Sequence, residues 1–180
     1  MLRRLGDNLR TRWLWWNLPS KPVRQVNLRD VIEDNPTSVK WHTQAETTAL
    51  LSMMSEVNLA KVEIARQSKT KMVGTIYKRT GCEIGIKLQR AEIRFDGLAG
   101  CLRTPSGGSS RQLILVVEEN KIRSRLMSSR ETARLMGLPE AYMLPDRYNQ
   151  AYHLTGDGVA VPVVRFIANS ILEPCLLRCS

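Results

Sequence analysis

The spacing of apolar residues is helical from Thr43 to about Arg66. Thr43 and Glu46 form a T-x-x-E capping box, so the first stripe predicts a helix of roughly three turns that begins there. A second stripe follows Glu56 and predicts another helix to about Arg66. Because these positions repeat at the period of one helix face, we assign them to a hydrophobic core. The apolar positions are Ala45, Leu50, Leu51, Met53, Met54, Val57, Ala60, Val62, Ile64 and Ala65.

The period changes between Lys71 and Glu119, where short runs rich in Val, Ile, Thr and Tyr alternate with turns that contain glycine. Such runs predict strands, because β-branched and aromatic side chains pack well on a pleated surface. This part of the chain is therefore expected to form a small β-rich region. The predicted strands are Met72–Tyr77, Ile84–Leu88, Ile93–Phe95 and Leu113–Val117.

A polar loop, Arg103–Arg111, lies within the β-rich region. It combines two arginines, four hydroxyl side chains and the pair Gly107-Gly108, whose lack of a Cβ lets a backbone approach a ligand closely. This composition suits contacts with phosphates or bases. An ordinary surface hairpin has a similar composition, so the loop by itself leaves both interpretations open.

A short helix with clear limits is predicted after the β-rich region. Ser128 and Glu131 form a second capping box, Gly137 stands where a left-handed stop belongs, and Pro139 blocks continuation. The helix between them should have about two turns.

The last predicted helix carries its apolar residues on one face and has Pro162 in its first turn, where a missing N–H is tolerated. Before it, Gly156-Asp157-Gly158 predicts a tight turn whose N–H groups and carboxylate could meet a small molecule. His153 is interpreted as a packed or surface residue rather than a ligand. The apolar positions are Val159, Val163, Phe166, Ile167 and Ile171.

Charge points to a polyanionic partner. The 180 residues include 27 Lys and Arg against 17 Asp and Glu, which gives a formal net charge of +10 and favours nucleic acid. A solvated basic surface without such a partner remains the alternative. With 43% hydrophobic and 24% charged residues, the chain has the composition of a folded protein rather than a disordered one.

Location and redox state follow from what the sequence carries. No apolar run approaches the roughly 18 residues of a membrane span, so we expect a soluble, cytoplasmic protein with no membrane partner. The four cysteines lack metal-ligand spacing and are expected to be reduced.

The start of the chain, residues 1–36, is basic, rich in Trp and interrupted by Pro, which is typical of a linker. Two interpretations of its Trp cluster stay open: packing against a core, and an exposed apolar contact surface for a partner.

Two segments resemble conserved motifs of the DNA (cytosine-5)-methyltransferases, the family found in restriction-modification systems. R-L-x-S-x-R-E-x-A-R-L-M-G-x-P, at Arg125–Pro139, is similar to the ninth motif, with serine in the place of its usual threonine. Y-x-x-x-G-D-x-V-x-x-x-V, at Tyr152–Val163, is similar to the tenth, with Asp157 in the place of asparagine. Gly97–Leu102, followed by Gly107-Gly108, resembles the end of the family's target-recognition domain, with Cys in its threonine position.

The resemblance implies the C-terminal half of such an enzyme. The expected fold is α+β: a small β-rich recognition domain with flanking helices, and a C-terminal helix that belongs to a Rossmann-like methyltransferase domain otherwise absent from the chain. It implies three parts: the linker at 1–36, a target-recognition domain with the ninth-motif helix at 37–150, and the tenth-motif turn and C-terminal helix at 151–180.

The same resemblance implies site residues. Double-stranded DNA would be the partner of the recognition domain, with DNA-facing residues Arg94, Arg103, Thr104, Gly107, Gly108, Ser109 and Arg111. Asp157, Gly158 and Val159 would border the methionine end of S-adenosyl-L-methionine, in a pocket shared with the rest of the enzyme. Arg130 and Glu131 are expected to hold the ninth-motif helix against the recognition domain. No metal site is expected.

The family's catalytic motifs are missing. The nucleophilic Pro-Cys pair, the Glu-Asn-Val segment and the Phe-x-Gly-x-Gly turn that holds the cofactor are not found, and Pro174-Cys175, at the tail and without a following Gln, is assigned to chance. No catalytic residue is therefore assigned, and methyl transfer would need a separate catalytic-half polypeptide. Two alternatives stay open: a stand-alone, non-catalytic DNA-binding protein, and an inactive gene remnant.

Overall fold

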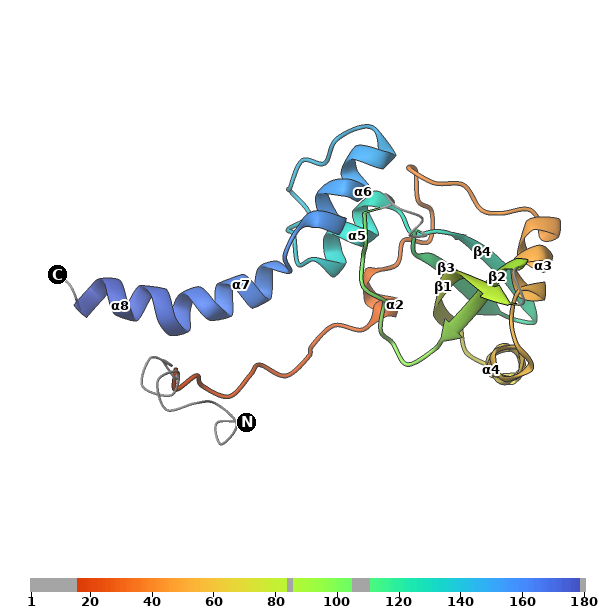
Figure 1. Ribbon diagram of the computed structural model, residues 1–180, viewed down its shortest axis with the longest axis horizontal. Helices are drawn as coiled ribbons and strands as arrows, with labels where there is room; N and C mark the ends of the chain where they lie inside the picture. Colours follow the sequence, from red (N-terminus) through yellow and green to blue (C-terminus); the bar gives the residue numbers. More distant parts are fainter. Residues whose placement is uncertain (1–15, 84–85, 105–110, 179–180) are drawn as a thin grey trace. The chain divides into compact units, whose positions relative to one another are not determined.

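The computed structural model describes residues 16–83, 86–104 and 111–178, and it combines helices with an antiparallel sheet (Figure 1). The predicted α+β class is confirmed. The chain divides into two compact units, a larger one at Arg24–Val161 and a second one that contains the residues from Pro162 on. Each unit is described by itself.

The sheet of the larger unit has the strand order β2-β1-β3-β4, and all neighbouring strands are antiparallel. The strands are β1 (Met72–Glu83), β2 (Ile86–Arg94), β3 (Leu113–Glu118) and β4 (Lys121–Leu126). Three differences from the predicted strands have physical reasons. β1 is longer than predicted, β2 is one strand where two were predicted, and β4 was not predicted at all, because polar residues on exposed or edge strands hide the β pattern.

The central strand β3 is buried on both faces of the sheet. Leu113, Leu115 and Val117 point to one core, and Ile114 and Val116 point to another. This alternation is what a period of two residues produces in a strand that is covered on both sides. The larger unit therefore has three layers.

Helices α3 (Gln44–Ser52) and α4 (Glu56–Gln67) cover the first face, as Figure 1 shows. Both were predicted within a few residues. The capping box at Thr43 is present: the Thr43 hydroxyl accepts from the N–H of Glu46, and the Glu46 carboxylate accepts from the N–H of Thr43.

Three helices lie on the second face: α2 (Leu28–Val31), α5 (Ser129–Leu135) and α6 (Tyr148–Asp157). Leu28 and Val31 are buried there, although their segment has the composition of a linker. The predicted capping box and the left-handed Gly137, at φ 74°, both bound α5.

The second unit contains most of a helical stretch made of α7 (Val161–Ile167), a π-helical turn η2 (Ala168–Leu172) and α8 (Glu173–Arg178). Pro162 lies in its first turn, as predicted. No residue of α7 or η2 is buried. By length and composition alone, the stretch Tyr148–Leu177 would be able to cross a membrane, which differs from the expectation that no such run exists. This is weak evidence, because core helices of soluble proteins pass the same test.

Candidate functional site

The predicted polar loop begins and ends against α6 and the sheet. Leu102, just before it, is buried in the core of the second face. After it, the N–H of Gln112 donates to the Tyr152 hydroxyl at 2.8 Å, and the Gln112 side-chain amide donates to the carbonyl of Ile76 at 2.7 Å. Both ends are thus fixed by buried contacts. Three candidate residues of the loop, Gly107, Gly108 and Ser109, lie outside the described residues.

The start of the loop contacts the last turn of α6. The Thr104 hydroxyl donates to the Asp157 carboxylate. Gly156 allows this approach, because a Cβ at that position would lie 3.0 Å from the Thr104 nitrogen and 3.1 Å from the Arg103 carbonyl carbon. The structure therefore brings together one residue that was predicted to face DNA and one that was predicted to face the cofactor.

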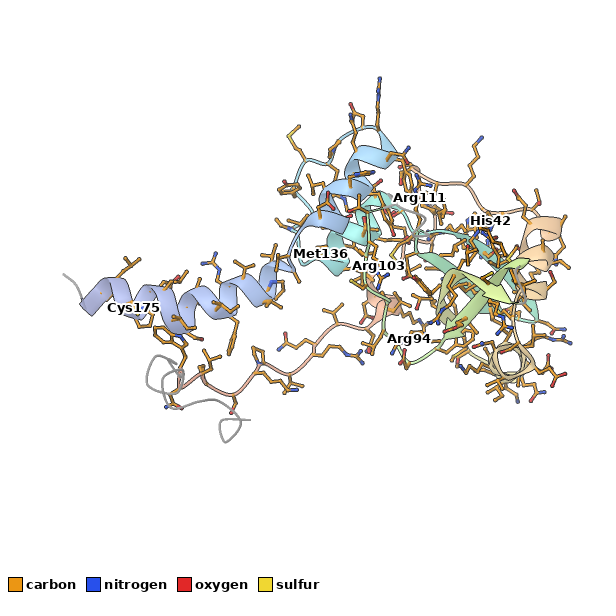
Figure 2. All side chains as sticks on the ribbon, in the orientation of Figure 1. His42, Arg94, Arg103, Arg111, Met136 and Cys175 are labelled. Carbon is orange, nitrogen blue, oxygen red and sulfur yellow. The ribbon has the colours of Figure 1, made fainter. Side chains whose placement is uncertain are left out.

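The two arginines of the loop have different surroundings, and Figure 2 labels both. Arg103 is exposed and makes no hydrogen bond or ion pair with another described residue. Arg111 is half-buried: it donates to Asn149 Oδ1 at 2.6 Å, and its guanidinium lies 5.7 Å from the centre of the Tyr148 ring. Part of the Arg111 hydrogen-bonding capacity therefore serves to hold α6.

Arg94 is not brought to this loop, and Figure 2 shows it apart from Arg103 and Arg111. It ends β2 and binds Asp96 through two nitrogens, with Nε 2.8 Å from Oδ1. This contact lowers the pKa of the Asp96 carboxyl and raises that of Arg94. Because Asp96 already balances the charge, Arg94 is the weaker of the candidate phosphate contacts.

The cofactor candidates lie at the end of α6. Asp157 is the last residue of the helix and is exposed, and Val159 is 67% exposed. The turn that follows is closed by a hydrogen bond from the Val161 N–H to the Met136 carbonyl at 2.8 Å. The predicted tight turn at Gly156-Asp157-Gly158 is wrong for its first two residues, because α6 extends through them.

The helix end also favours glycine at position 158, because a Cβ there would lie 3.0 Å from the Leu154 carbonyl oxygen. The side chains of this turn, Asp157 and Val159, nevertheless fit the methionine end of S-adenosylmethionine. A carboxylate accepts from an ammonium group, and the exposed Val159 side chain suits apolar carbon.

A buried ion pair holds α5 to the sheet. Arg125 on β4 and Glu131 on α5 are both fully buried and are joined by two hydrogen bonds of 2.6 and 2.8 Å. Arg125 also donates to the carbonyl of Glu33, and the Glu131 carboxylate accepts from the N–H groups of Glu33 and Ser128. The expected structural role of Glu131 agrees with these contacts, and Arg130 contributes a bond to the Tyr142 carbonyl.

Sequence reasoning missed Arg125 and Tyr152. Arg125 opens the ninth-motif segment, six residues before Glu131, and a buried acid that stays charged needs such a partner. That need was the available signal. Tyr152 opens the tenth-motif segment, and its buried hydroxyl fixes the end of the loop.

Within residues 16–83, 86–104 and 111–178, no group of three His, Cys, Asp or Glu side chains is arranged to hold a metal.

The chain is similar to a known protein family and to several known proteins. The family described as C-5 cytosine-specific DNA methylase matches residues 15–173. The type II methyltransferase M1.ScrFI of Lactococcus lactis subsp. cremoris is 43% identical over 60 residues, which are 33% of this chain and 15% of that protein. The type II methyltransferase M.HpaII of Haemophilus parainfluenzae is 33% identical over 93 residues, which are 43% of this chain and 25% of that protein.

A third relative is the type II methyltransferase M.SsoII of Shigella sonnei, which is 36% identical over 59 residues, 33% of this chain and 16% of that protein. The chain thus spans a quarter or less of the length of these relatives.

Proposed function

Because the chain belongs to the C-5 cytosine-specific DNA methylase family, we propose that it is the part of such an enzyme that grips DNA and closes the cofactor pocket. Membership confirms the predicted resemblance to this family. In this proposal the sheet unit binds duplex DNA, and the end of α6 completes a pocket whose other walls lie in a catalytic half. The expected setting is soluble and cytoplasmic.

One observation supports the proposal above all: the Thr104 hydroxyl donates to the Asp157 carboxylate. A methyltransferase must hold its target base next to the methyl donor, so DNA-facing and cofactor-facing residues have to be neighbours. Arg103 lies beside Thr104 and is exposed, which suits a phosphate contact at the same place.

S-adenosylmethionine, the methyl donor of this family, would supply the methyl group when bound. The Asp157 carboxylate would accept from its ammonium group, and Val159 would cover apolar carbon. The hydrogen bond from Thr104 would keep the carboxylate in place. Because the same hydroxyl belongs to the DNA-binding loop, occupation of one site would steady the other.

A separate catalytic half is the second part of the proposal. The sequence contains no Glu-Asn-Val and no Phe-x-Gly-x-Gly segment. Four apolar side chains of α7, those of Val161, Val163, Val164 and Ile167, are exposed, and an exposed apolar patch on a soluble protein commonly marks a docking surface. In this proposal α7 and the helical residues after it pack on the Rossmann-like domain of the catalytic half.

The test is a complementation assay. The chain is mixed with an N-terminal methyltransferase fragment that carries the three missing motifs, and transfer of labelled methyl groups to duplex DNA is measured. Activity is expected only when both polypeptides are present. No activity in the mixture, with both polypeptides folded, would contradict the enzyme proposal.

The alternative is a DNA-binding protein without catalysis, and the net charge of +10 supports it equally. Binding of the isolated chain to duplex DNA should weaken steeply with salt, because each neutralised phosphate releases counterions. Arg103→Gln should reduce the affinity by about fivefold or more, whereas Arg29→Gln, at an exposed arginine of α2, is the matched control. Binding without methyl transfer in the complemented mixture would favour this alternative.

A further inference from the structure

The strands β1 and β2 extend beyond the rest of the sheet as a two-stranded ribbon. β3 pairs with β1 only from Met72 to Ile76, whereas β2 pairs with β1 up to Glu83, which lies opposite Ile86. From Tyr77 on, β1 therefore has a strand neighbour on one side only. At the rise of an antiparallel strand, this projecting part is about 20 Å long.

Beyond Lys78, the side chains of the ribbon are mostly exposed. Nearer the sheet, Ala91 is buried against the end of α3, where it forms a β-bridge with Met54. From Arg79 outwards no such cover exists among the described residues. The exposed residues are Arg79, Thr80, Cys82, Lys87, Leu88, Gln89 and Arg90.

One face of the ribbon combines charge, an open backbone and an apolar side chain. Arg79 and Arg90 stand directly opposite each other, and so do Gly81 and Leu88. Like charges in opposite positions destabilise a strand pair, although Glu92 lies 3.4 Å from Arg79 and offsets part of this. Both arginines are exposed, so this face presents positive charge to the solvent and suits a polyanion.

Gly81 gives an independent indication. A Cβ at this position would meet no atom within 4 Å, and the residue does not have a positive φ. Neither packing nor backbone conformation therefore requires glycine. Glycine inside a strand weakens it, and where the fold does not need it, it marks a place where another molecule comes close to the backbone.

The ribbon projects from the same end of the sheet at which the polar loop returns. Ile76 pairs with Leu113, so β1 leaves the sheet next to Gln112 and Arg111. Thr75, on the same face as Arg79, donates its hydroxyl to the carbonyl of Leu98 in the segment that leads to the loop. The described ends of the loop and the ribbon face thus lie on one side of the larger unit.

We propose that the β1–β2 ribbon is a second DNA-binding element, which enters the major groove of duplex DNA with its Arg79, Arg90, Gly81 and Leu88 face. The major groove is about 12 Å wide and admits a two-stranded β-ribbon. Arginine pairs with guanine or phosphate, and an apolar side chain suits the thymine methyl group. This inference rests on the proposed function, because it takes duplex DNA as the partner.

The experiment compares two double variants of the full chain that each lower the net charge from +10 to +8. The ribbon variant is Arg79→Gln with Arg90→Gln. The control variant is Lys69→Gln with Lys121→Gln, at exposed lysines near the opposite end of the sheet, where Met72 pairs with Val117. Binding to duplex DNA is measured by fluorescence anisotropy at several salt concentrations, with thermal unfolding as the check on folding.

The ribbon variant is expected to bind roughly tenfold to a hundredfold more weakly, with a salt slope smaller by about one to two. The control variant should change by less than about threefold. If both variants lose affinity for DNA equally while the unsubstituted chain binds, the proposed role of the ribbon is overturned and the proposed DNA partner is not. No binding by the unsubstituted chain would overturn the proposed DNA partner as well.

The Gly81→Val variant tests whether the ribbon approaches DNA closely at this position, independently of its charge. The substitution adds a good strand former where the structure has open space, so folding should be kept. Net charge is unchanged, and binding is nevertheless expected to fall by about fivefold or more because the ribbon can no longer approach as closely. Affinity equal to that of the unsubstituted chain would overturn insertion into the groove.

Discussion

Helices α5 and α7 each have seven residues, and their burial is the reverse of their composition. α5 reads S-R-E-T-A-R-L and buries Ser129, Glu131, Thr132 and Ala133. α7 reads V-P-V-V-R-F-I and buries none of its residues. Burial therefore depends on what a helix finds to pack against, and polarity alone does not decide it.

The polar groups of α5 can be buried because each has a partner. Glu131 is joined to Arg125, the Thr132 hydroxyl donates to the Ser129 carbonyl, and Thr155 on α6 donates to Thr132. A buried polar group costs little when its hydrogen bonds are satisfied. α7 presents the opposite case, because Val163 is 51% and Ile167 is 43% exposed. Among the described residues, α7 therefore combines an apolar composition with exposed side chains.

The largest expected effect is the loss of the buried ion pair. Glu131→Gln leaves the Arg125 charge buried without its counter-ion, and the free energy of unfolding should fall by about 3–5 kcal/mol. Urea denaturation measures this. Glu140→Gln is the matched control, because Glu140 pairs with Arg134 at the surface, where water screens the interaction. Equal effects of the two substitutions would show that burial of the α5 pair has no special cost.

A smaller loss is expected from Tyr152→Phe. The substitution removes the hydroxyl that accepts from the Gln112 N–H and leaves that buried donor without a partner. The free energy of unfolding should fall by about 1–3 kcal/mol. Tyr142→Phe, at an exposed tyrosine, should leave stability unchanged in the same denaturation experiment. A neutral Tyr152→Phe would mean that the loop end does not depend on α6.

The same region should respond to alkaline pH. Burial raises the pKa of both Tyr148 and Tyr152 above the usual tyrosine value of 10.0. The folded chain therefore keeps protons that the unfolded chain releases near pH 10, so stability from these groups is present below about pH 10 and falls as the pH rises above it. The urea midpoint should decline above about pH 10, less steeply in Tyr152→Phe. A midpoint that declines equally in Tyr152→Phe and in the original chain would contradict this.

Much of the fold was predictable because local signals agreed with the tertiary structure. The capping boxes at Thr43 and Ser128, and Gly137 with its positive φ, fixed three helix ends from short-range chemistry. β4 was missed, because K-I-R-S-R-L carries its charges on an edge strand. α6 was missed as well, because the glycine within it reads as a turn, and only the close approach of Thr104 explains Gly156.

The candidate site was predictable in part. The motif segments indicated Thr104 and Asp157 separately, but only the folded chain brings their side chains into contact. The ribbon residues Arg79 and Arg90 gave no local signal, since their meaning depends on strand register and on where β3 ends. Such information is long-range and does not follow from residue types.

The smallest expected effect on stability is the one that tests α7 most directly. In Val163→Gln with Ile167→Gln, two good helix formers replace exposed apolar residues, so helix propensity is kept. Because neither side chain is buried, the free energy of unfolding of the isolated chain should change by less than about 0.5 kcal/mol. Val73→Gln, at a residue that is 8% exposed in the sheet, is the control and should be strongly destabilising.

Methyl transfer should respond to this double variant more strongly than stability does. If α7 packs on a catalytic half, the same double variant loses methyl transfer in the complemented mixture, because glutamine side chains would be buried without partners at that interface. Stability without activity is the combination that identifies a docking helix. A loss of stability above about 1 kcal/mol in the isolated chain would instead mean that α7 belongs to the chain's own core. In that case the contrast with α5 would disappear, and the exposed apolar surface would no longer argue for a second polypeptide.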